Sequence, residues 1–367
     1  MQLAGTALYA PLLVGGLLGG VISDRFDRLK TVRFQLGVLV PVTVLIGILV
    51  RSNRIAVWTV YLYMFVVGIG WVTDMTSRRA LVFDIVGPEN LDRAMALESV
   101  SLSSGMAVGA LVGGSAVEAV GIGASYFLIA VFLVLALGLL ATVKRPSRAT
   151  SSPSTPSTPS SLPAPSPTSS VRDLVDGVRL LGASRGVVGI LGVTVIANFF
   201  LFAYFPIVPI VAKRLDASPF QVGLLLSGTG LGMMGGSMLF ARFTPHRRGL
   251  SYLLGVYFAM LLVIPFALGR NYWLALAAII ASGLGSGLFG STQGALVIAE
   301  APEELRGRAL GLLSMAIGAL PLGMYSLGEV AELAGVPAAL VANMVIGALV
   351  LTYWMRRHPE IIRMTAS

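Results

Sequence analysis

The motif Gly68-Ile69-Gly70 … Pro88-Glu89-Asn90-Leu91 … Arg93-Ala94 occurs twice in the chain. It returns as Gly283-Leu284-Gly285 … Pro302-Glu303-Glu304-Leu305 … Arg308-Ala309, at offsets of 214 and 215 residues. An earlier pair agrees, because Gly20 and Arg25-Phe26 return as Gly236 and Arg242-Phe243. A repeat of this length in an apolar chain predicts two homologous membrane halves, a common construction of secondary transporters.

Composition supports a membrane protein and excludes several other classes. Of the 367 residues, 56% are hydrophobic and 12% are charged, and the mean hydropathy is +0.85. Cysteine is absent, and the two histidines, His246 and His358, cannot form a ligand cluster, so we expect no metal site and no cofactor. The net charge of +9 comes from basic residues that lie between apolar blocks, so we expect no nucleic-acid partner.

Eleven apolar blocks each have about the length that crosses a bilayer, roughly 20 residues. Every block must be helical, because hydrocarbon offers no partner to free backbone N–H and C=O groups. The fold class is therefore predicted to be an all-α membrane protein. The blocks are Leu3–Ser23, Val32–Val50, Ala56–Met75, Ala94–Ala119, Ser125–Val143, Val187–Ala212, Phe220–Ala241, Leu250–Leu268, Trp273–Ala299, Ala309–Ala331 and Pro337–Met355.

The basic residues predict the orientation of these helices. Of the 26 Lys and Arg residues, 21 follow odd-numbered blocks or lie in the C-terminal tail, and 5 follow even-numbered blocks. Cytoplasmic loops carry the excess of basic residues in membrane proteins. We therefore expect a multi-pass protein of the cell membrane whose C-terminus is cytoplasmic.

The loop after the first block contains the most specific motif, Gly20-Val21-Ile22-Ser23-Asp24-Arg25-Phe26-Asp27-Arg28. It resembles the loop between helices 2 and 3 of the major facilitator superfamily, with Asp27 in place of the usual second glycine. Asp-Arg-Phe-Asp-Arg at this place is similar to the branch that exports drugs, macrolides and siderophores. The resemblance implies two helical bundles that rock about a shared site.

The same resemblance implies a role for the charges of this loop. In the family the cluster latches the two halves in the outward-facing state, and the matching residues here are Gly20, Asp24, Arg25 and Arg28. Arg78 or Arg79 is the expected ion partner of Asp24. The alternative is that these charges only satisfy the orientation rule.

The repeat and the resemblance together define the expected domains. Residues 1–145 form an N-terminal bundle (helices 2–6 of the fold), residues 146–170 a disordered linker rich in Ser and Pro, residues 171–358 a C-terminal bundle with a surface helix at Val171–Ala183 and helices 7–12, and residues 359–367 a cytoplasmic tail. Moving Val187–Ala212 back by one repeat places its counterpart before Met1. We therefore expect eleven of twelve helices, the first being absent from this sequence; a natural eleven-helix transporter is the alternative.

The fourth block contains glycines at helical spacing, namely Gly105, Gly109, Gly113 and Gly114. They resemble the antiporter signature of the superfamily, although Ala110 replaces its proline. Pro321 is expected to provide an equivalent bend in the second half. The alternative is that the glycines only allow close helix packing, as in many unrelated membrane helices.

Polar and aromatic residues inside the predicted spans are candidates for the substrate path and for proton coupling. A polar side chain is costly in lipid and is expected to face the bundle interior. The substrate-path candidates are Asn198, Phe202, Tyr204, Gln293 and Asn343, although the aromatic ones can equally face lipid. The proton-coupling candidates are Asp74 and Glu98; a capping or ion-paired role for Asp74 is the alternative.

These features predict a secondary active transporter rather than an enzyme, since no catalytic or nucleotide-binding motif stands in a suitable context. We expect proton-linked efflux of a hydrophobic or cationic small molecule by a monomer in the lipid bilayer. The alternative is a truncated or mis-started membrane remnant that transports nothing.

Overall fold

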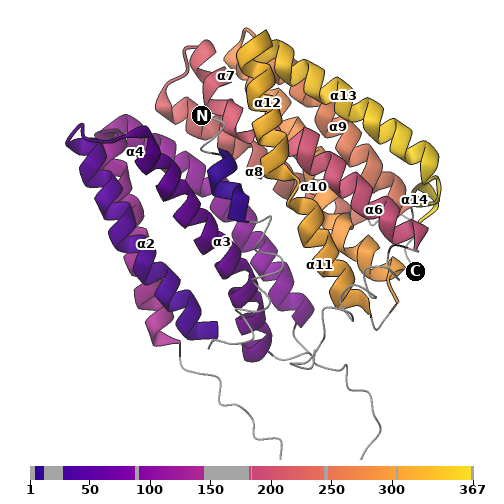
Figure 1. Cartoon of the computed structure of the whole chain (residues 1–367), viewed down its shortest axis with the longest axis horizontal. Coiled ribbons are helices and arrows are strands. Elements are labelled where there is room, and N and C mark those ends of the chain that lie inside the picture. The colour runs from indigo at the N-terminus through magenta and orange to yellow at the C-terminus, as the bar shows by residue number, and fades with distance from the viewer. Residues whose placement is uncertain are drawn as a thin grey trace, which may run out of the picture.

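The computed structural model describes residues 5–11, 28–86, 91–143, 182, 184–243, 247–302 and 305–364. The described residues form helices joined by short turns, arranged in two groups (Figure 1). The predicted linker 146–170 and the predicted surface helix, apart from Gly182, lie outside the described residues.

The first half consists of the short segment 5–11 and three longer elements: α2 (Arg28–Arg51), α3 (Val57–Val86) and α4 (Leu91–Thr142). α4 is a hairpin of two helical arms rather than one rod, because Gly105 and Phe132 line the same groove although they are 27 positions apart in sequence. The arms meet at Gly121, whose φ of 81° and ψ of 167° suit glycine and disfavour other residues.

The second half begins with the span Arg185–Arg214, which changes winding three times and which we call the interrupted span. Figure 1 shows the remaining helices of this half packed beside one another. The elements of the second half are α6 (Arg185–Ile196), η2 (Ala197–Leu201), η3 (Phe202–Ile207), α7 (Val208–Arg214), α8 (Pro219–Phe243), α9 (Arg248–Leu268), α10 (Tyr272–Glu300), α11 (Arg306–Ile317), α12 (Leu320–Ala334), α13 (Val336–Arg357) and α14 (Glu360–Arg363).

These helices follow the predicted apolar blocks closely. Within the described ranges, nine helical stretches are long and apolar enough to cross a membrane. One of them, Ser104–Thr142, covers most of two predicted blocks because it includes the turn at Gly121. The first predicted block is described only at residues 5–11, so the total of eleven spans stays a prediction. The tenth block is divided between α11 and α12, with Pro321 in the first turn of α12.

Burial differs strongly between the two halves. In the most apolar stretch of the span Arg185–Arg214, 67% of the residues are buried, against 17% for Val57–Asp74 and 11% for Ser104–Thr142. The second half therefore contains the well-packed core, with Tyr204, Tyr252 and Phe266 among its fully buried side chains. The first half presents most of its apolar side chains to its surroundings.

The halves meet along α4 and α8, a contact we call the seam. Gly114 and Gly223 face each other there, since a Cβ built on Gly223 would lie 2.9 Å from the Cα of Gly114. The Ser227 hydroxyl donates to the Ala107 carbonyl nearer the middle of the two helices. The seam therefore depends on small residues that let two backbones approach.

One end of the seam is fastened by a carboxylate. Glu118 Oε2 accepts hydrogen bonds from Ser218 Oγ at 2.6 Å and from the Phe220 N–H at 2.8 Å. The Ser218 N–H donates to Gln221 Oε1 at 2.8 Å, which forms part of a capping box at the start of α8. A carboxylate at a helix N-terminus is favourable because it satisfies free N–H groups and opposes the helix dipole. We call this the Glu118 end; the other is the basic end, where α2 begins and α13 ends.

Candidate functional site

The span Arg185–Arg214 is interrupted near its middle. α6 passes at Ala197 into a π-helical turn, and the chain then winds as a 3-10 helix over Phe202–Ile207 before α7 begins. Pro206 lies within the 3-10 segment, where it removes a backbone donor and its ring disturbs the preceding turn. Interrupted helices concentrate at transport sites, because their irregular backbone can serve a ligand.

Four uncharged polar side chains meet beside this interruption. Thr194 Oγ1 accepts a hydrogen bond from Gln293 Nε2 at 2.9 Å and lies 2.9 Å from the Tyr252 hydroxyl. The Thr194 and Tyr252 hydroxyls also donate to the Ile190 carbonyl, at 3.0 and 3.2 Å. Asn198 Nδ2 donates to the Thr194 carbonyl at 2.9 Å. We call Thr194, Asn198, Tyr252 and Gln293 the polar cluster.

The polar cluster is almost enclosed. Thr194 and Tyr252 are fully buried, while Asn198 and Gln293 retain 5% and 9% of their exposure. All buried polar residues of the described part are uncharged, so the cluster offers hydrogen bonds and no formal charge. The Gln293 side chain is the least buried of the four.

A row of aromatic rings continues from the polar cluster. The Phe289 ring stacks on the Tyr252 ring with centroids 4.9 Å apart and planes 13° apart. The Phe202 ring lies 5.8 Å from that of Phe289 and 5.7 Å from that of Phe205. Such rings present apolar faces with negative electrostatic potential, which suits hydrophobic and cationic compounds.

Not all of the predicted substrate-path residues come together. Asn198 and Gln293 both bond Thr194, and Phe202 lies in the aromatic row next to them. Tyr204 is fully buried in the core of the second half. Asn343 Nδ2 donates to the Phe200 carbonyl at 2.6 Å, so it fastens α13 to the π-helical turn.

Thr194, Tyr252 and Glu118 are not among the site residues predicted from the sequence. Thr194 precedes Asn198 by four residues, a spacing that places both side chains on one helix face, so this signal was available. Tyr252 and Glu118 give no comparable local signal. Their roles depend on which helices pack against α9 and against the end of the first arm of α4.

Three residues of the predicted latch, Gly20, Asp24 and Arg25, lie outside the described residues. The described helices include Arg28, Arg78, Arg79 and Glu98, but not their side chains. Asp74 is partly buried on α3. The latch and the coupling carboxylate therefore stay predictions.

The glycines of the fourth block divide into two groups. Gly114 lies in the seam, where a built Cβ would come within 2.6 Å of the Pro219 carbonyl oxygen. A Cβ built on Gly105, Gly109 or Gly113 would meet no atom within 4 Å. The two groups therefore face different surroundings, and the signature role proposed for them stays a prediction.

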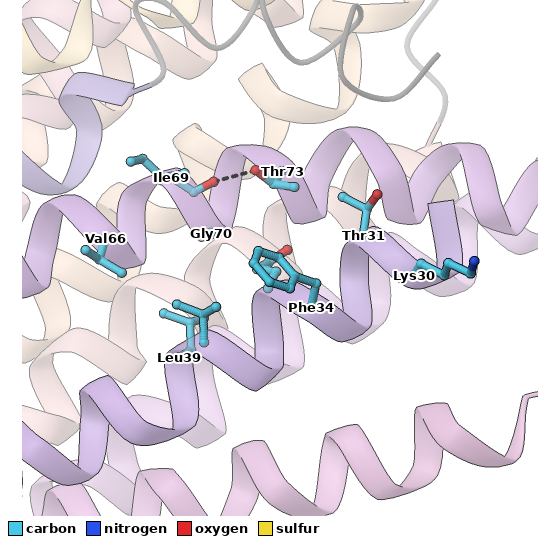
Figure 2. A pocket seen from close by; sticks show the side chains of 10 residues that line it. Lys30, Thr31, Phe34, Leu39, Val66, Ile69, Gly70 and Thr73 are labelled. Atoms are coloured by element: carbon cyan, nitrogen blue, oxygen red, sulfur yellow. Dashed lines mark hydrogen bonds between the residues drawn. The ribbon is translucent and has the colours of Figure 1, made fainter. Parts of the chain in front are cut away.

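A separate groove of about 610 Å³ lies between α2 and α3 toward the basic end (Figure 2). Phe34 and Leu39 from α2 and Val66 and Ile69 from α3 line it. All of its lining residues belong to the first half, so it is distinct from the polar cluster. Within the described ranges, no group of three or more His, Asp or Glu side chains could hold a metal ion.

Comparison with known proteins identifies the family of this helical protein. A family model of the major facilitator superfamily, described as a transmembrane secretion effector, matches residues 1–364. The chain belongs to this family. It is therefore a multi-pass membrane transporter of the major facilitator superfamily and not an enzyme.

Curated relatives of this transporter include exporters. The enterobactin exporter EntS of Shigella flexneri is 26% identical over 366 residues, which cover 96% of this chain and 81% of the relative. The enterobactin exporter EntS of Escherichia coli O1:K1 / APEC is 27% identical over 369 residues, with the same coverage.

Solved structures of transporters share the fold. A D-xylose-proton symporter superimposes with a TM-score of 0.74 at 16% identity, covering all of this chain and 89% of the symporter. A bacterial homologue of the human lysosomal transporter Spinster gives a TM-score of 0.71 at 14% identity, covering 99% of this chain and 91% of the homologue. At these identities the likeness concerns the fold alone.

Proposed function

We propose that this transporter exports a hydrophobic or cationic small molecule by alternating access, with protons as the coupling ion. The observation that carries the proposal is the polar cluster, which lies beside the interruption of the span Arg185–Arg214. Secondary transporters of this type place their substrate near the middle of the membrane, at interrupted helices. The adjoining row of Phe202 and Phe289 supplies the apolar and cation-attracting surface.

The direction of transport is inferred from the relatives, because two of them are enterobactin exporters. Enterobactin is accordingly the first compound to test. Asp74 and Glu98 remain the proposed coupling carboxylates, and the loop charges Asp24, Arg25 and Arg28 the proposed latch.

Alternating access requires the halves to meet at one end at a time. The seam and the Glu118 carboxylate support a state closed at the Glu118 end, which the basic residues predict to be external. In this proposal, rocking about the polar cluster opens the seam and closes the basic end.

The proposal is tested with inside-out membrane vesicles from cells that express the chain. We expect energised vesicles to take up enterobactin or the cationic dye ethidium, and an uncoupler to abolish the uptake. Gln293→Met should reduce uptake several-fold, because it removes the least buried amide of the polar cluster and keeps the side-chain length. Thr142→Val is the matched control, since Thr142 is exposed at the end of α4 and donates only to its own helix, to the Leu139 carbonyl.

The export proposal would be contradicted if, for every compound tested, uptake equals that of vesicles without the chain. Uptake that survives the uncoupler would remove proton coupling alone. Equal losses in Gln293→Met and Thr142→Val would remove the polar cluster from the substrate path.

A second candidate function is a membrane component that does not transport by itself. The observation that favours it is a wide apolar groove in the first half, between α3 and the two arms of α4. In the second half, the interrupted span packs against Gly323 of α12 and Gly347 of α13. An inactive chain with a stable second half would support this candidate.

A further inference from the structure

The segment that follows α13 folds back onto the second half. His358 leaves the helical conformation, with φ of −127° and ψ of 61°, because the ring of Pro359 disfavours helical backbone in the residue before it. The short helix α14 then packs against α6 and α9. Figure 1 shows α14 at the end of α13, next to the start of α6. We call residues 358–364 the C-terminal clasp.

The C-terminal clasp is seated on the start of α9. Ile361 is fully buried and Met364 is 8% exposed. The Gly249 N–H donates to the Met364 carbonyl at 3.2 Å. A Cβ built on Gly249 would overlap the Ile361 carbonyl group, so the close approach of the two backbones requires glycine at this position of α9.

The same isoleucine also contacts α6. A Cβ built on Gly189 would lie 2.9 Å from Ile361 Cδ1, so the isoleucine side chain rests against the backbone of α6. The Trp354 indole N–H donates to the Gly189 carbonyl at 3.0 Å and holds the end of α13 at the same place. Ile361 therefore lies between α6 and α9, and its size helps to set their separation.

Charged groups close the outer side of the C-terminal clasp. Glu360 Oε1 lies 3.1 Å from His358 Nδ1 and 3.6 Å from Arg185 Nε at the start of α6. The Arg185 side chain is 75% exposed, and ion pairs of this kind contribute little stability. The buried contacts of Ile361 are therefore the main attachment of the clasp.

The polar cluster begins a short distance from this contact. Thr194 follows Gly189 by five residues and Tyr252 follows Gly249 by three, which correspond to about 7.5 and 4.5 Å along the helix axes. The Tyr252 hydroxyl reaches from α9 to α6, where it lies 2.9 Å from Thr194 Oγ1. Hydrogen bonds weaken steeply when their atoms separate, so this contact depends on the spacing of α6 and α9.

We propose that Ile361 is a positioning residue for the polar cluster. The C-terminal clasp holds α6 and α9 at the separation at which the Tyr252 hydroxyl meets Thr194. A segment outside the membrane spans thus sets the geometry of a buried site within them. The use of that site in transport rests on the proposed function, and neither measurement below involves transport.

The first measurement tests whether the clasp is seated on α9. Met364→Cys supplies a single cysteine, because the chain has none of its own. A maleimide should label it slowly in the purified full chain, since position 364 is buried. Adding Gly249→Val should accelerate the labelling at least about tenfold, because the new side chain would displace the Ile361 backbone. Gly290→Val is the matched control, since a Cβ built there meets no atom within 4 Å.

The second measurement tests the coupling between the clasp and the polar cluster. Tyr252→Phe should lower the thermal unfolding midpoint of the parent chain, because it removes the hydroxyl that bonds α6. In an Ile361→Ala background the same change should lower the midpoint by less than half as much, since the helices are no longer held at bonding distance. Effects of independent sites add, whereas those of coupled sites do not.

Val263→Ala is the control background for this comparison. Val263 is also fully buried, but it lies eleven residues beyond Tyr252 on α9, about 16 Å along the axis. Tyr252→Phe should lower the midpoint there as much as in the parent chain. Ile361→Val removes the carbon that touches Gly189 and should give an intermediate result, so the comparison stands even if Ile361→Ala does not fold.

Two outcomes would each overturn the proposal. One is a fall in midpoint from Tyr252→Phe that is as large in the Ile361→Ala and Ile361→Val backgrounds as in the parent chain, which would make the clasp a stabilising segment alone. The other is labelling of Met364→Cys that is already fast without Gly249→Val. A chain that gives the expected results in both measurements but transports nothing would contradict the export proposal and leave this inference intact.

Discussion

At the scale of single residues, Thr194 is the centre of the polar cluster. Its hydroxyl has three partners, and its carbonyl accepts from Asn198. A buried polar group that loses its partner costs about 1–3 kcal/mol, whereas a satisfied one contributes little net stability. An apolar substitution at Thr194 is therefore expected to cost more unfolding free energy than the same substitution at an exposed threonine.

Thr194→Val should lower the thermal unfolding midpoint of the purified chain, because it leaves the Gln293 amide and the Tyr252 hydroxyl short of a partner. The expected loss is about 1–3 kcal/mol of unfolding free energy. Thr194→Ser keeps the hydroxyl and should stay close to the parent chain. Thermal unfolding in detergent measures both variants. Equal midpoints for the valine and serine variants would contradict the role of the hydroxyl.

Glu118 is a second single residue with a defined role, because its carboxylate joins the two halves at one end of the seam. Glu118→Ala should loosen the start of α8, because the Ser218 hydroxyl and the Phe220 N–H lose their acceptor. In an Ala107→Cys background, where position 107 is buried in the seam, a membrane-impermeant maleimide should then label the cysteine faster than without Glu118→Ala. Glu332→Ala is the matched control, since Glu332 precedes Gly335 by three residues as Glu118 precedes Gly121. Equal labelling with and without Glu118→Ala would show that Glu118 does not hold the seam closed.

At the scale of elements, two glycines of α4 have different surroundings: Gly114 packs against α8, whereas Gly138 has no neighbouring atom near a built Cβ. Gly114→Val should destabilise the protein by about 1–3 kcal/mol, because the new side chain would overlap the backbone of α8. Gly138→Val, in the second arm of the same element, should be tolerated because no atom lies within 4 Å of a built Cβ. Expression level and thermal unfolding in detergent compare the two. A tolerated Gly114→Val would mean that α4 and α8 are further apart than described.

The winding of the interrupted span depends on its contacts with neighbouring helices. Pro206 lies in the 3-10 segment and Pro209 in the first turn of α7, where each removes a backbone donor. The change of winding begins earlier, at Ala197. Next to it, the Asn198 amide donates to the Thr194 carbonyl, and the Phe200 carbonyl accepts from Asn343. A π-helical turn is not specified by local propensity, because its cost is offset by contacts with other helices.

At the scale of the whole molecule, the seam is the described contact between the two halves that a covalent link can lock. Ala107→Cys and Gly230→Cys should form a disulfide, since a Cβ built on Gly230 lies 3.4 Å from that of Ala107, close to the usual separation of about 3.5–4.5 Å. The chain has no other cysteine to compete. If the halves rock, oxidation should abolish vesicle uptake and a reductant should restore it. Uptake unaffected by a fully formed disulfide would exclude rocking at the seam.

The protein class, the internal repeat and most of the membrane spans can be predicted from the amino-acid sequence alone. Apolar length specifies a membrane helix strongly, because hydrocarbon tolerates no unpaired backbone, and the duplicated Gly68 and Gly283 motifs require two related halves. Asn198 and Gln293 were also within reach, since a polar side chain in a span is expected to face protein. Their joint contact with Thr194 was not, because it joins α6 and α10 across 99 residues.

Which helix faces are covered by a neighbouring helix is visible only once the helices are packed together. The spacing of Gly105, Gly109 and Gly113 is the same whether or not a helix lies against these glycines. Glycine spacing allows close helix packing, but it does not show that a partner helix is present. The seam at Gly114 and the cap at Glu118 likewise depend on α8, which is about 100 residues away in sequence. Local sequence sets which segments cross the membrane, whereas long-range packing sets which of their surfaces meet.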